Sequence, residues 1–391
     1  MCLELECCAH YKKIKVDGFL TGSEDLDILK CICAPLAKGF RMREVEKILS
    51  IIVPSYNMEA YLPKCLGSLV IGDKELLQKL DVIVVNDGSK DRTSEVAHEF
   101  EAKYPGVFRV IDKANGNYGS CINAALPVAE GIFVKVLDAD DSFNVMGFIR
   151  FLKYLDGCDA DLVISDYDVV DENGVVTEHR TYDFPTDKVF SFKEFGATSR
   201  YLSMHAYTYR IKVVQTAGYR QLEGVSYSDS EWVLLPLVGV KKITYSPETV
   251  YRYLRGRAGQ TMEAKQIAKN FWMLARLALD MLRQFVNSKP AASQEAIEYL
   301  LPRLTSRVAN VYRGGIFGSN GLRARIDLSK FDMELKTCHP DFYEYMNAEV
   351  YCHRIPYRYI SGWRKKVLLQ YPLILLCKAY SWIASRKALF R

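Results

Sequence analysis

The chain is poor in proline, with 13 in 391 residues, and it has no long apolar run. The unbroken apolar stretch Tyr371–Cys377 is far shorter than the ~20 residues that span a bilayer. The first ten residues lack the basic start and the apolar core of a secretory signal peptide, so we expect no leader. With 49% apolar and 25% charged residues, the composition excludes a disordered or collagen-like chain and predicts two or three globular domains.

Acidic residues are absent from the last 41 positions, which hold nine Lys and Arg. Residues 1–260 carry 31 basic and 37 acidic side chains, whereas residues 261–391 carry 21 and 10. An acidic front part joined to a basic tail predicts an anionic partner for the tail. Nucleic acid is not expected as that partner, because no nucleic-acid-binding motif occurs.

The eleven cysteines are an odd number and show no paired C-x-x-C spacing. The early group therefore does not favour a structural zinc site; it consists of Cys2, Cys7, Cys8, Cys31 and Cys33. Free thiols in a large chain are typical of a reducing compartment, so we expect a cytoplasmic protein.

The chain is expected to have three parts. Residues 1–46 show no sustained period and predict an extension without an assigned function. Residues 47–260 predict an α/β domain, and residues 261–391 predict a basic helical region, with helical stretches at Ala264–Phe285 and Gln294–Val311.

Short apolar runs alternate with helical stretches, such as Thr93–Tyr104, in the first half of the α/β domain. The runs are Ile48–Val53, Val82–Val85, Val107–Ile111 and Ile132–Leu137. Strands that alternate with helices predict βαβ units and a parallel sheet buried on both faces. Polar turns follow the runs, and in open α/β sheets ligands bind at the carboxyl ends of the strands.

Three acidic residues stand directly after the fourth run, in Asp138-Ala139-Asp140-Asp141. Two carboxylates that flank one residue at a strand end can hold a hard divalent cation and leave positions for phosphate oxygens. An acidic first turn of a helix would need only one or two of the three. We therefore predict a Mn²⁺ or Mg²⁺ site at Asp140 and Asp138.

Two further segments follow strand runs. In Asn86-Asp87-Gly88-Ser89, Gly88 permits a tight turn that would leave the Asp87 carboxylate exposed to a nucleobase or ribose. A capped turn into the next helix is the alternative, and both can hold. The loop from Lys113 to Asn123 opens a helix and could bring Lys113 to a ligand, although a plain loop explains its glycines equally well.

The order of these motifs resembles the family 2 inverting glycosyltransferases over roughly residues 47–260. The resemblance rests on Ile51–Asn57, Asn86–Asp91, Asn115–Asn123 and Leu137–Asp141. It implies a GT-A fold, which is a Rossmann-like α/β domain for nucleotide-diphospho-sugars. It also implies a metal-dependent, inverting transferase of the hexosyltransferase type.

The resemblance also implies roles for single residues. Asp87 would bind uracil or ribose, Asp138 would contact the nucleotide, and Asp140 would ligate the cation at the diphosphate. The other residues expected to bind the nucleotide-sugar are Pro54, Tyr56, Glu59, Lys113, Asn115 and Arg257. Arg257 and its neighbour Arg255 lie in a segment that resembles a loop closing over the diphosphate, and solvated surface arginines are the alternative.

Family members place a catalytic base at the start of a later helix. Asp229 matches that position, with Glu231 as the fallback, and a simple helix N-cap is the alternative for Asp229. Inverting transfer needs such a carboxylate to take the proton of the acceptor hydroxyl. His205 and Trp232 are weaker candidates for acceptor contact, since a lone histidine is more often a packing residue. The loop reads Asn117-Tyr118-Gly119 where related sequences often read Gly-His-Gly.

The tail, residues 354–391, mixes aromatic and basic residues with short apolar runs. This mixture suits a helix in an anionic membrane interface, and a helix packed on the catalytic domain is the alternative.

We expect transfer from a UDP-sugar to a hydroxyl of a saccharide or lipid-linked saccharide. The reaction would take place at the cytoplasmic face of the cell membrane, in the synthesis of surface polysaccharide or glycolipid. Two alternatives stay open: transfer onto a polyprenyl phosphate, which needs no base, and a non-catalytic protein that binds nucleotide-sugars or glycans.

Overall fold

The computed structural model describes residues 46–366 apart from 187, 198–201, 226–227, 258–270, 318–320 and 350–357. The chain divides into two units, residues 1–45 and 46–391, and the described residues belong to the second. The early cysteines lie outside the described residues, as does the predicted boundary at residue 260, which stays a prediction.

One mixed, curled sheet of nine strands forms the centre of the described part, in the order β3-β2-β1-β4-β8-β6-β9-β5, and β7 pairs with β6. The first four strands are β1 (Leu49–Ser55), β2 (Leu80–Asn86), β3 (Phe108–Asp112) and β4 (Phe133–Val136). They run parallel, as predicted. Strands β1, β2 and β4 are buried along their whole length, which explains their continuous apolar runs.

Beyond β4 the sheet departs from the parallel arrangement. The strand β8 (Tyr207–Arg210) lies antiparallel between β4 and β6 (Leu162–Val170), and β7 (Val176–Arg180) is antiparallel to β6. The long strand β9 (Ile243–Leu254) runs parallel to β6 and ends beside β5 (Ser142–Phe143). As a result, the end of β9 lies next to the acidic motif.

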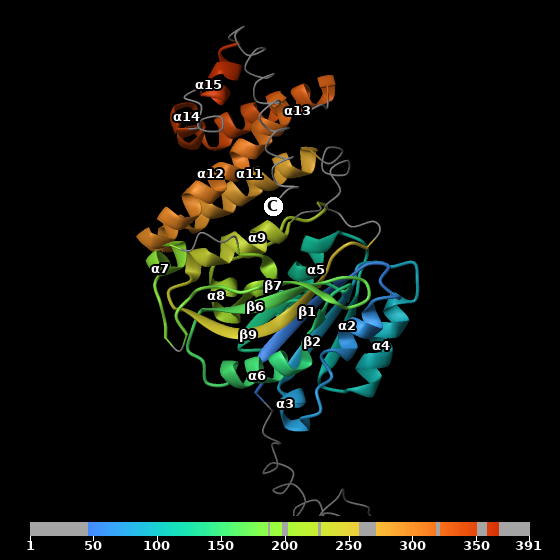
Figure 1. Cartoon of the computed structure of the whole chain (residues 1–391). Helices are drawn as coiled ribbons and strands as arrows, with labels where there is room; N and C mark the ends of the chain where they lie inside the picture. Colours follow the sequence, from blue (N-terminus) through green and yellow to red (C-terminus); the bar gives the residue numbers. More distant parts are fainter. Residues whose placement is uncertain are drawn as a thin grey trace, which may run out of the picture. The chain divides into compact units, whose positions relative to one another are not determined.

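Helices cover both faces of the sheet (Figure 1). Those of the α/β part are α2 (Leu62–Gly67), α3 (Lys74–Gln78), α4 (Thr93–Lys103), α5 (Tyr118–Ala125), α6 (Val145–Leu155), α7 (Phe192–Ala197), α8 (Ile211–Thr216) and α9 (Asp229–Leu234). Short 3-10 turns lie at Leu126–Val128, Met204–Ala206, Leu235–Gly239 and Lys289–Ala291.

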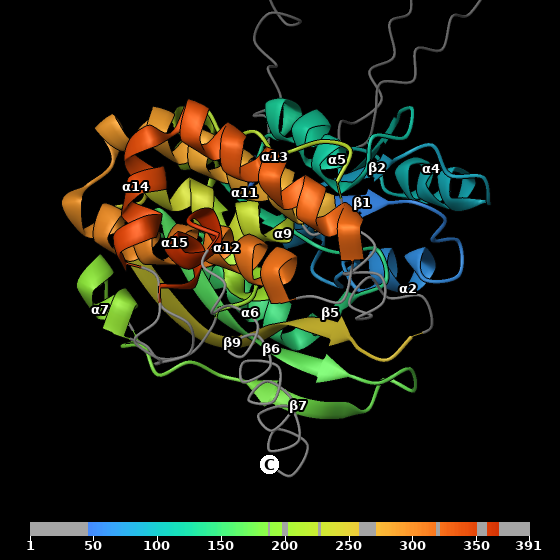
Figure 2. The ribbon, with the colours of Figure 1, turned by 90° about the horizontal axis from the view of Figure 1, so that it is seen from above.

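The C-terminal region is helical, as predicted. It comprises α11 (Phe271–Ser288), α12 (Gln294–Phe317), α13 (Gly321–Cys338), α14 (Pro340–Glu349) and α15 (Tyr359–Arg364). Figure 2 shows α13 and α14 crossing over α11 and α12. Leu277, Met281 and Leu304 belong to the same buried apolar cluster as the sheet, so α11 and α12 complete the main core.

The described part of the tail packs on these helices. The Arg364 guanidinium donates to Asp332 at 2.7 Å and stacks on the Tyr343 ring at 3.4 Å, and Ile360 is fully buried. Residues 367–391 lie outside the described residues, so the membrane-interface interpretation of the tail stays a prediction. Within the described ranges, no helix combines the length and the apolar character needed to cross a membrane.

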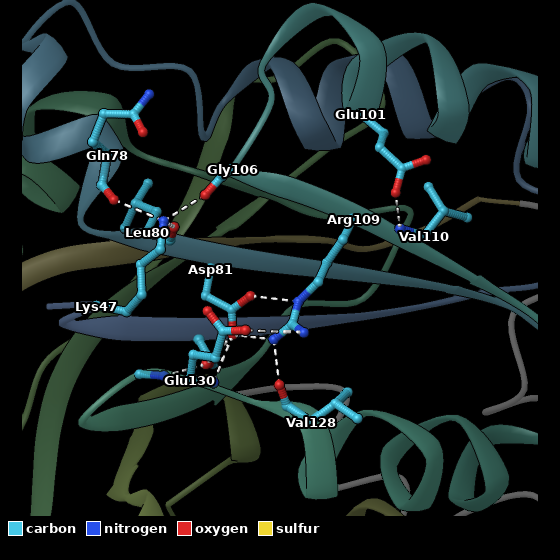
Figure 3. Close-up of polar contacts among 12 residues, drawn as sticks. Lys47, Gln78, Leu80, Asp81, Glu101, Gly106, Arg109, Val110, Val128 and Glu130 are labelled. Atoms are coloured by element: carbon cyan, nitrogen blue, oxygen red, sulfur yellow. Dashed lines mark hydrogen bonds and ion pairs between the residues drawn. The ribbon is translucent and has the colours of Figure 1, made fainter. Parts of the chain in front are cut away.

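A polar network connects the amino ends of the parallel strands (Figure 3). The buried Asp81 carboxylate accepts hydrogen bonds from Ser50 Oγ at 2.6 Å, Arg109 Nε at 2.7 Å and the Glu130 backbone N–H at 2.9 Å. Lys47 Nζ donates to the backbone carbonyls of Gln78 and Leu80, both at 2.8 Å. This network lies at the end of the sheet opposite the polar turns and serves the fold.

Candidate active site

A pocket of about 1170 Å³ opens at the carboxyl ends of β1 and β4. Residues from distant parts of the chain line it, including α9, the end of β9 and the helices α11 and α12. Six predicted site residues are among them, namely Pro54, Asp138, Asp140, His205, Asp229 and Arg257. The pocket therefore brings the predicted metal motif and the predicted base into one space.

The three acids of the motif have different partners. Asp138 Oδ1 accepts a hydrogen bond from the Tyr118 hydroxyl at 2.9 Å. Asp140 Oδ2 pairs with Arg257 Nε at 2.6 Å. Asp141 accepts hydrogen bonds from the Tyr251 hydroxyl and the Leu254 backbone N–H, both at 2.7 Å, and so attaches β9 to the motif.

The acidic motif concentrates negative charge in a poorly solvated place. Burial and, after it, the charge of Asp140 raise the pKa of Asp138 to about 7. Burial also raises the pKa of Asp141, with added repulsion from Asp138 and Asp140. A divalent cation would offset this repulsion, so the charge of the motif fits one.

The ligand atoms also suit a divalent cation. One atom each of Asp138, Asp141 and His205 lie within 4.8 Å of one another. Carboxylate oxygens and imidazole are ligands for Mn²⁺ and similar ions. Asp140 lies in the same pocket but is held by Arg257, so the predicted pair Asp138 and Asp140 stays a prediction. A cation held there would stabilise negative charge on phosphate oxygens bound beside it.

Asp87 is not exposed, which corrects the expectation from the sequence. It is 2% exposed, and its carboxylate accepts hydrogen bonds from Lys113 Nζ at 2.7 Å and from the N–H groups of Gly116 and Asn117 at 2.9 Å. Asn115 Nδ2 donates to the Asp87 carbonyl at 2.9 Å. Asp87, Lys113 and Asn115 therefore shape the loop that precedes α5, and their contacts with a nucleotide-sugar stay a prediction.

This loop lies close to a distant segment. A Cβ on Gly119 would overlap the backbone carbonyl of Leu222, so the close approach requires glycine. The predicted tight turn at Gly88 is confirmed by its φ of +71°.

Tyr56 is 43% exposed, and the exposed Glu59 accepts a hydrogen bond from the Arg92 backbone N–H at 2.9 Å. Tyr56 and Glu59 lie outside the pocket lining, and their nucleotide contacts stay a prediction.

Asp229 is the first residue of α9, and Ser228 occupies the N-cap position. The structure therefore does not support the N-cap alternative for Asp229. Its carboxylate is reached by solvent through the pocket, although protein surrounds it. This enclosure raises the pKa of Asp229, and the positive charge of Arg307 lowers it in part.

Glu231 and Trp232 point away from the pocket into the core. Glu231 is fully buried, and its Oε2 accepts a hydrogen bond from the Leu222 backbone N–H at 2.9 Å. Burial raises the pKa of Glu231 to about 9, so this carboxyl is neutral near pH 7 and does not suit a base. Trp232 is 1% exposed and packs edge-on against Tyr209, with ring centroids 5.3 Å apart.

His205 combines packing with access to the pocket. Its ring lies 4.6 Å from that of Tyr251 and 4.5 Å from that of Tyr253, and Nδ1 is 2.7 Å from Ser203 Oγ. Burial lowers the pKa of His205 to about 3, so the imidazole is neutral and can serve as a ligand or as a hydrogen-bonding group.

A buried lysine below the acidic motif was not among the predicted site residues. Lys135 on β4 is fully buried, and its Nζ donates to the carbonyls of His205 at 2.7 Å and Tyr207 at 3.2 Å. It therefore holds the turn that carries His205 against the strand that leads to Asp138. In the sequence, Lys135 was a single polar interruption of an apolar run.

We expect Lys135→Met to leave the protein folded and to lower turnover about tenfold, because small misplacements of site residues are costly. Methionine fills the space but donates no hydrogen bond to the turn. Turnover and a thermal unfolding curve would be measured together, with the exposed Lys242→Met as the control. Wild-type turnover in a folded Lys135→Met protein would contradict this role.

Two more features became visible only in the structure. The Tyr118 hydroxyl connects the loop to Asp138. Arg307 and Asn310 on α12 line the pocket, although their segment showed only helical periodicity. In the sequence, the unusual Asn-Tyr-Gly triplet already drew attention to Tyr118, whereas no sequence pattern pointed to Arg307.

Residues 50–221 match the family model for glycosyl transferase family 2. The chain is 34% identical to the uncharacterized glycosyltransferase EpsJ of Bacillus subtilis over 116 residues, which are 30% of this chain and 33% of EpsJ. It is 34% identical to the minor teichoic acid biosynthesis protein GgaB of Bacillus subtilis over 107 residues, which are 27% of this chain and 12% of GgaB. The chain thus spans at most a third of the length of these two relatives.

Among solved structures, residues 1–349 of S. aureus TarS in complex with UDP-GlcNAc share the fold. The TM-score is 0.52 at 19% sequence identity, and the match covers 73% of this chain and 81% of that one. A second structure of S. aureus TarS also has a TM-score of 0.52, at 18% identity over 76% of this chain and 50% of that one. The chain therefore belongs to glycosyl transferase family 2 through residues 50–221, and its α/β domain has the GT-A fold.

Proposed function

We propose that this glycosyltransferase moves a hexose from a UDP-sugar to a hydroxyl group of a saccharide or lipid-linked saccharide, with inversion at the sugar C1. The observation that carries the proposal is the single pocket that holds Asp138 and Asp140 together with Asp229. The acidic pair suits the donor diphosphate with its cation, and Asp229 suits the acceptor hydroxyl. The bound donor in the TarS complex, UDP-GlcNAc, supports a UDP-sugar.

In the proposed reaction, the acceptor oxygen attacks C1 from the face opposite the diphosphate. Asp229 takes the proton of that hydroxyl, the new C1–O bond forms, and the bond from C1 to the diphosphate oxygen breaks with its electron pair. No covalent intermediate on the enzyme is needed. Arg257, released from Asp140, can pair with the leaving diphosphate through its guanidinium.

The proposed setting is the cytoplasmic face of the cell membrane, in the synthesis of a surface polymer or glycolipid. The basic composition of residues 354–391 supports contact with an anionic surface. The name of the relative GgaB, a teichoic acid biosynthesis protein, supports a cell-surface product.

The proposal is tested by incubating the purified protein with a panel of UDP-sugars and GDP-sugars, with Mn²⁺ and with excess chelator. We expect transfer or slow hydrolysis of one UDP-sugar, and a product whose anomeric configuration is opposite to that of the donor. NMR of the product reads the configuration directly. Retention of configuration would contradict the role of Asp229, and binding without any turnover would favour a non-catalytic protein.

Asp140→Asn is expected to weaken UDP-sugar binding at least tenfold in the presence of Mn²⁺, because a neutral amide offers the cation no charge. Isothermal titration measures this affinity with and without chelator. The control is Asp156→Asn, an exposed residue outside the pocket. Because Asp140→Asn also removes the ion pair with Arg257, Arg257→Gln is titrated in parallel. Full transfer activity in excess chelator would contradict a metal-dependent site.

A further inference from the structure

One side chain of the pocket lies beside both the acidic motif and the proposed base. The Tyr118 hydroxyl donates a hydrogen bond to Asp138 Oδ1 at 2.9 Å. Burial and, after it, the charges of Asp138 and Asp229 raise the pKa of Tyr118, so both carboxylates are close enough to act on the phenol. Tyr118, Asp138 and Asp229 all line the same pocket, and Tyr118 is partly exposed.

The loop that carries Tyr118 is fixed by polar contacts. The buried Asp87 carboxylate accepts hydrogen bonds from the N–H groups of Gly116 and Asn117, both at 2.9 Å. Ser120 Oγ donates to the Asn117 carbonyl at 2.6 Å. A side chain on such a fixed backbone loses little further freedom when it binds a ligand. Tyr118 is therefore held in a defined position at the pocket.

The proposed reaction places the sugar of the donor in the same space. The diphosphate would lie at Asp138 and Asp140, and the acceptor hydroxyl would lie at Asp229. The sugar C1 is bonded to the diphosphate and is attacked by that hydroxyl, so the sugar ring would lie between these two places. A side chain beside both Asp138 and Asp229 is therefore in position to contact the ring.

The hydrogen bond to Asp138 determines what the Tyr118 hydroxyl can offer to a ligand. A tyrosine hydroxyl has one hydrogen to donate and can also accept a hydrogen bond. Because its hydrogen is donated to Asp138, the oxygen can only accept a further one. Such a fixed acceptor suits a sugar O–H or amide N–H, and it discriminates against a sugar that lacks the matching group.

We propose that Tyr118 is a specificity-determining residue that contacts the sugar of the donor, with its hydroxyl oxygen accepting a hydrogen bond from an O–H or N–H group of that sugar. This inference rests on the proposed function. It adds a residue for the sugar to those proposed for the nucleotide and the cation.

Isothermal titration of the full-length protein in the presence of Mn²⁺ tests this contact. The probes are UDP and four UDP-sugars, namely UDP-glucose, UDP-galactose, UDP-GlcNAc and UDP-GalNAc, and the UDP-sugar that binds most tightly is compared with UDP. In Tyr118→Phe, we expect the affinity for this UDP-sugar relative to UDP to fall about fivefold or more, the usual contribution of one hydrogen bond. An unchanged relative affinity would overturn the proposal, even if both ligands were weakened, because Tyr118 would then only position Asp138.

Tyr251→Phe is the matched control. The Tyr251 hydroxyl also binds the acidic motif, since it donates to Asp141 at 2.7 Å and accepts from the Asp138 N–H at 3.0 Å. Tyr251 is fully buried and lies outside the pocket lining, so it cannot touch the sugar. This variant should weaken UDP and the UDP-sugar alike and leave their relative affinity unchanged. A fall in relative affinity equal to that of Tyr118→Phe would overturn the proposal, because a disturbed motif would explain both.

Analogues of the donor identify the group that Tyr118 contacts. Each analogue lacks one hydroxyl or the N-acetyl group of the sugar and is titrated into the unmodified protein and into Tyr118→Phe. One deletion should weaken binding to the unmodified protein and have no effect in Tyr118→Phe, because both changes remove the same hydrogen bond. Equal losses in the two proteins for every analogue would contradict the contact.

A failure of this inference is distinct from a failure of the proposed function. A protein that binds none of the four UDP-sugars would lose both. A protein that transfers one of these sugars, with an unchanged relative affinity in Tyr118→Phe, would keep the proposed function and lose only the contact with Tyr118.

Discussion

Asp229→Asn is expected to lower turnover by about 10²–10⁴-fold, which is the usual contribution of general base catalysis. The change removes a proton acceptor and keeps the size of the side chain. Donor affinity should change little, because the donor is expected to be held by Asp138 and Asp140, which lie in a different segment from Asp229. Turnover would be measured at saturating donor, and donor affinity by titration.

Two further variants identify the cause of such a loss. Glu231→Gln should keep nearly full turnover, because burial raises the pKa of Glu231 to about 9 and the amide resembles the neutral acid. Asp159→Asn, in a residue outside the pocket lining that pairs with Lys242, controls for the general loss of a charge. Wild-type turnover in Asp229→Asn would remove Asp229 from the mechanism and favour an acceptor phosphate that needs no base.

The pH dependence of turnover also tests whether Asp229 is the base. A base must be ionised, so turnover should rise with pH through the pKa of Asp229. Because the enclosing protein raises that pKa, the acidic limb should lie above the usual range of an aspartate. Removal of the Arg307 charge in Arg307→Gln should move this limb to higher pH, since that charge lowers the pKa of Asp229.

Asp81→Ala is expected to lower the free energy of unfolding by about 3–5 kcal/mol, the range for the loss of one partner from a buried ion pair. Asp81 is 3% exposed, and its removal leaves Ser50 Oγ and the Glu130 N–H without this acceptor. Arg109 is partly exposed, and water can solvate its guanidinium after the loss of Asp81. We therefore expect a loss of stability at the lower end of this range. Urea unfolding followed by circular dichroism measures the change.

The chain contains a matched control for this prediction. Lys79 and Asp156 form an ion pair at 2.8 Å, close to the 2.7 Å between Arg109 and Asp81, but here the carboxylate is exposed and the lysine is partly exposed. Exposed pairs contribute about 0–1 kcal/mol, so Asp156→Ala should have a small effect. Equal losses in the two variants would contradict the conclusion that burial makes the Asp81 network important. Both variants should keep donor binding, because the network lies at the amino ends of the strands.

Local sequence patterns determined the first half of the fold and the motif at its centre. Short apolar runs predict buried parallel strands because both faces of such strands meet helices, and β1 to β4 follow this rule. The acidic motif was visible because its three carboxylates follow one strand directly. The bounds of α4 also followed from helical periodicity, since periodicity depends only on neighbours in the chain.

The tertiary structure alone decided the roles that depend on contacts between distant segments. Asp87 and Lys113 are 26 positions apart, and no local pattern shows that their ion pair buries the carboxylate expected to face the ligand. Asp229 and Glu231 are two positions apart on one short helix, yet the first lines the pocket and the second lies in the core. Arg307 joins Asp229 in the pocket because α12 packs over the sheet, and this packing depends on apolar surface from the whole domain.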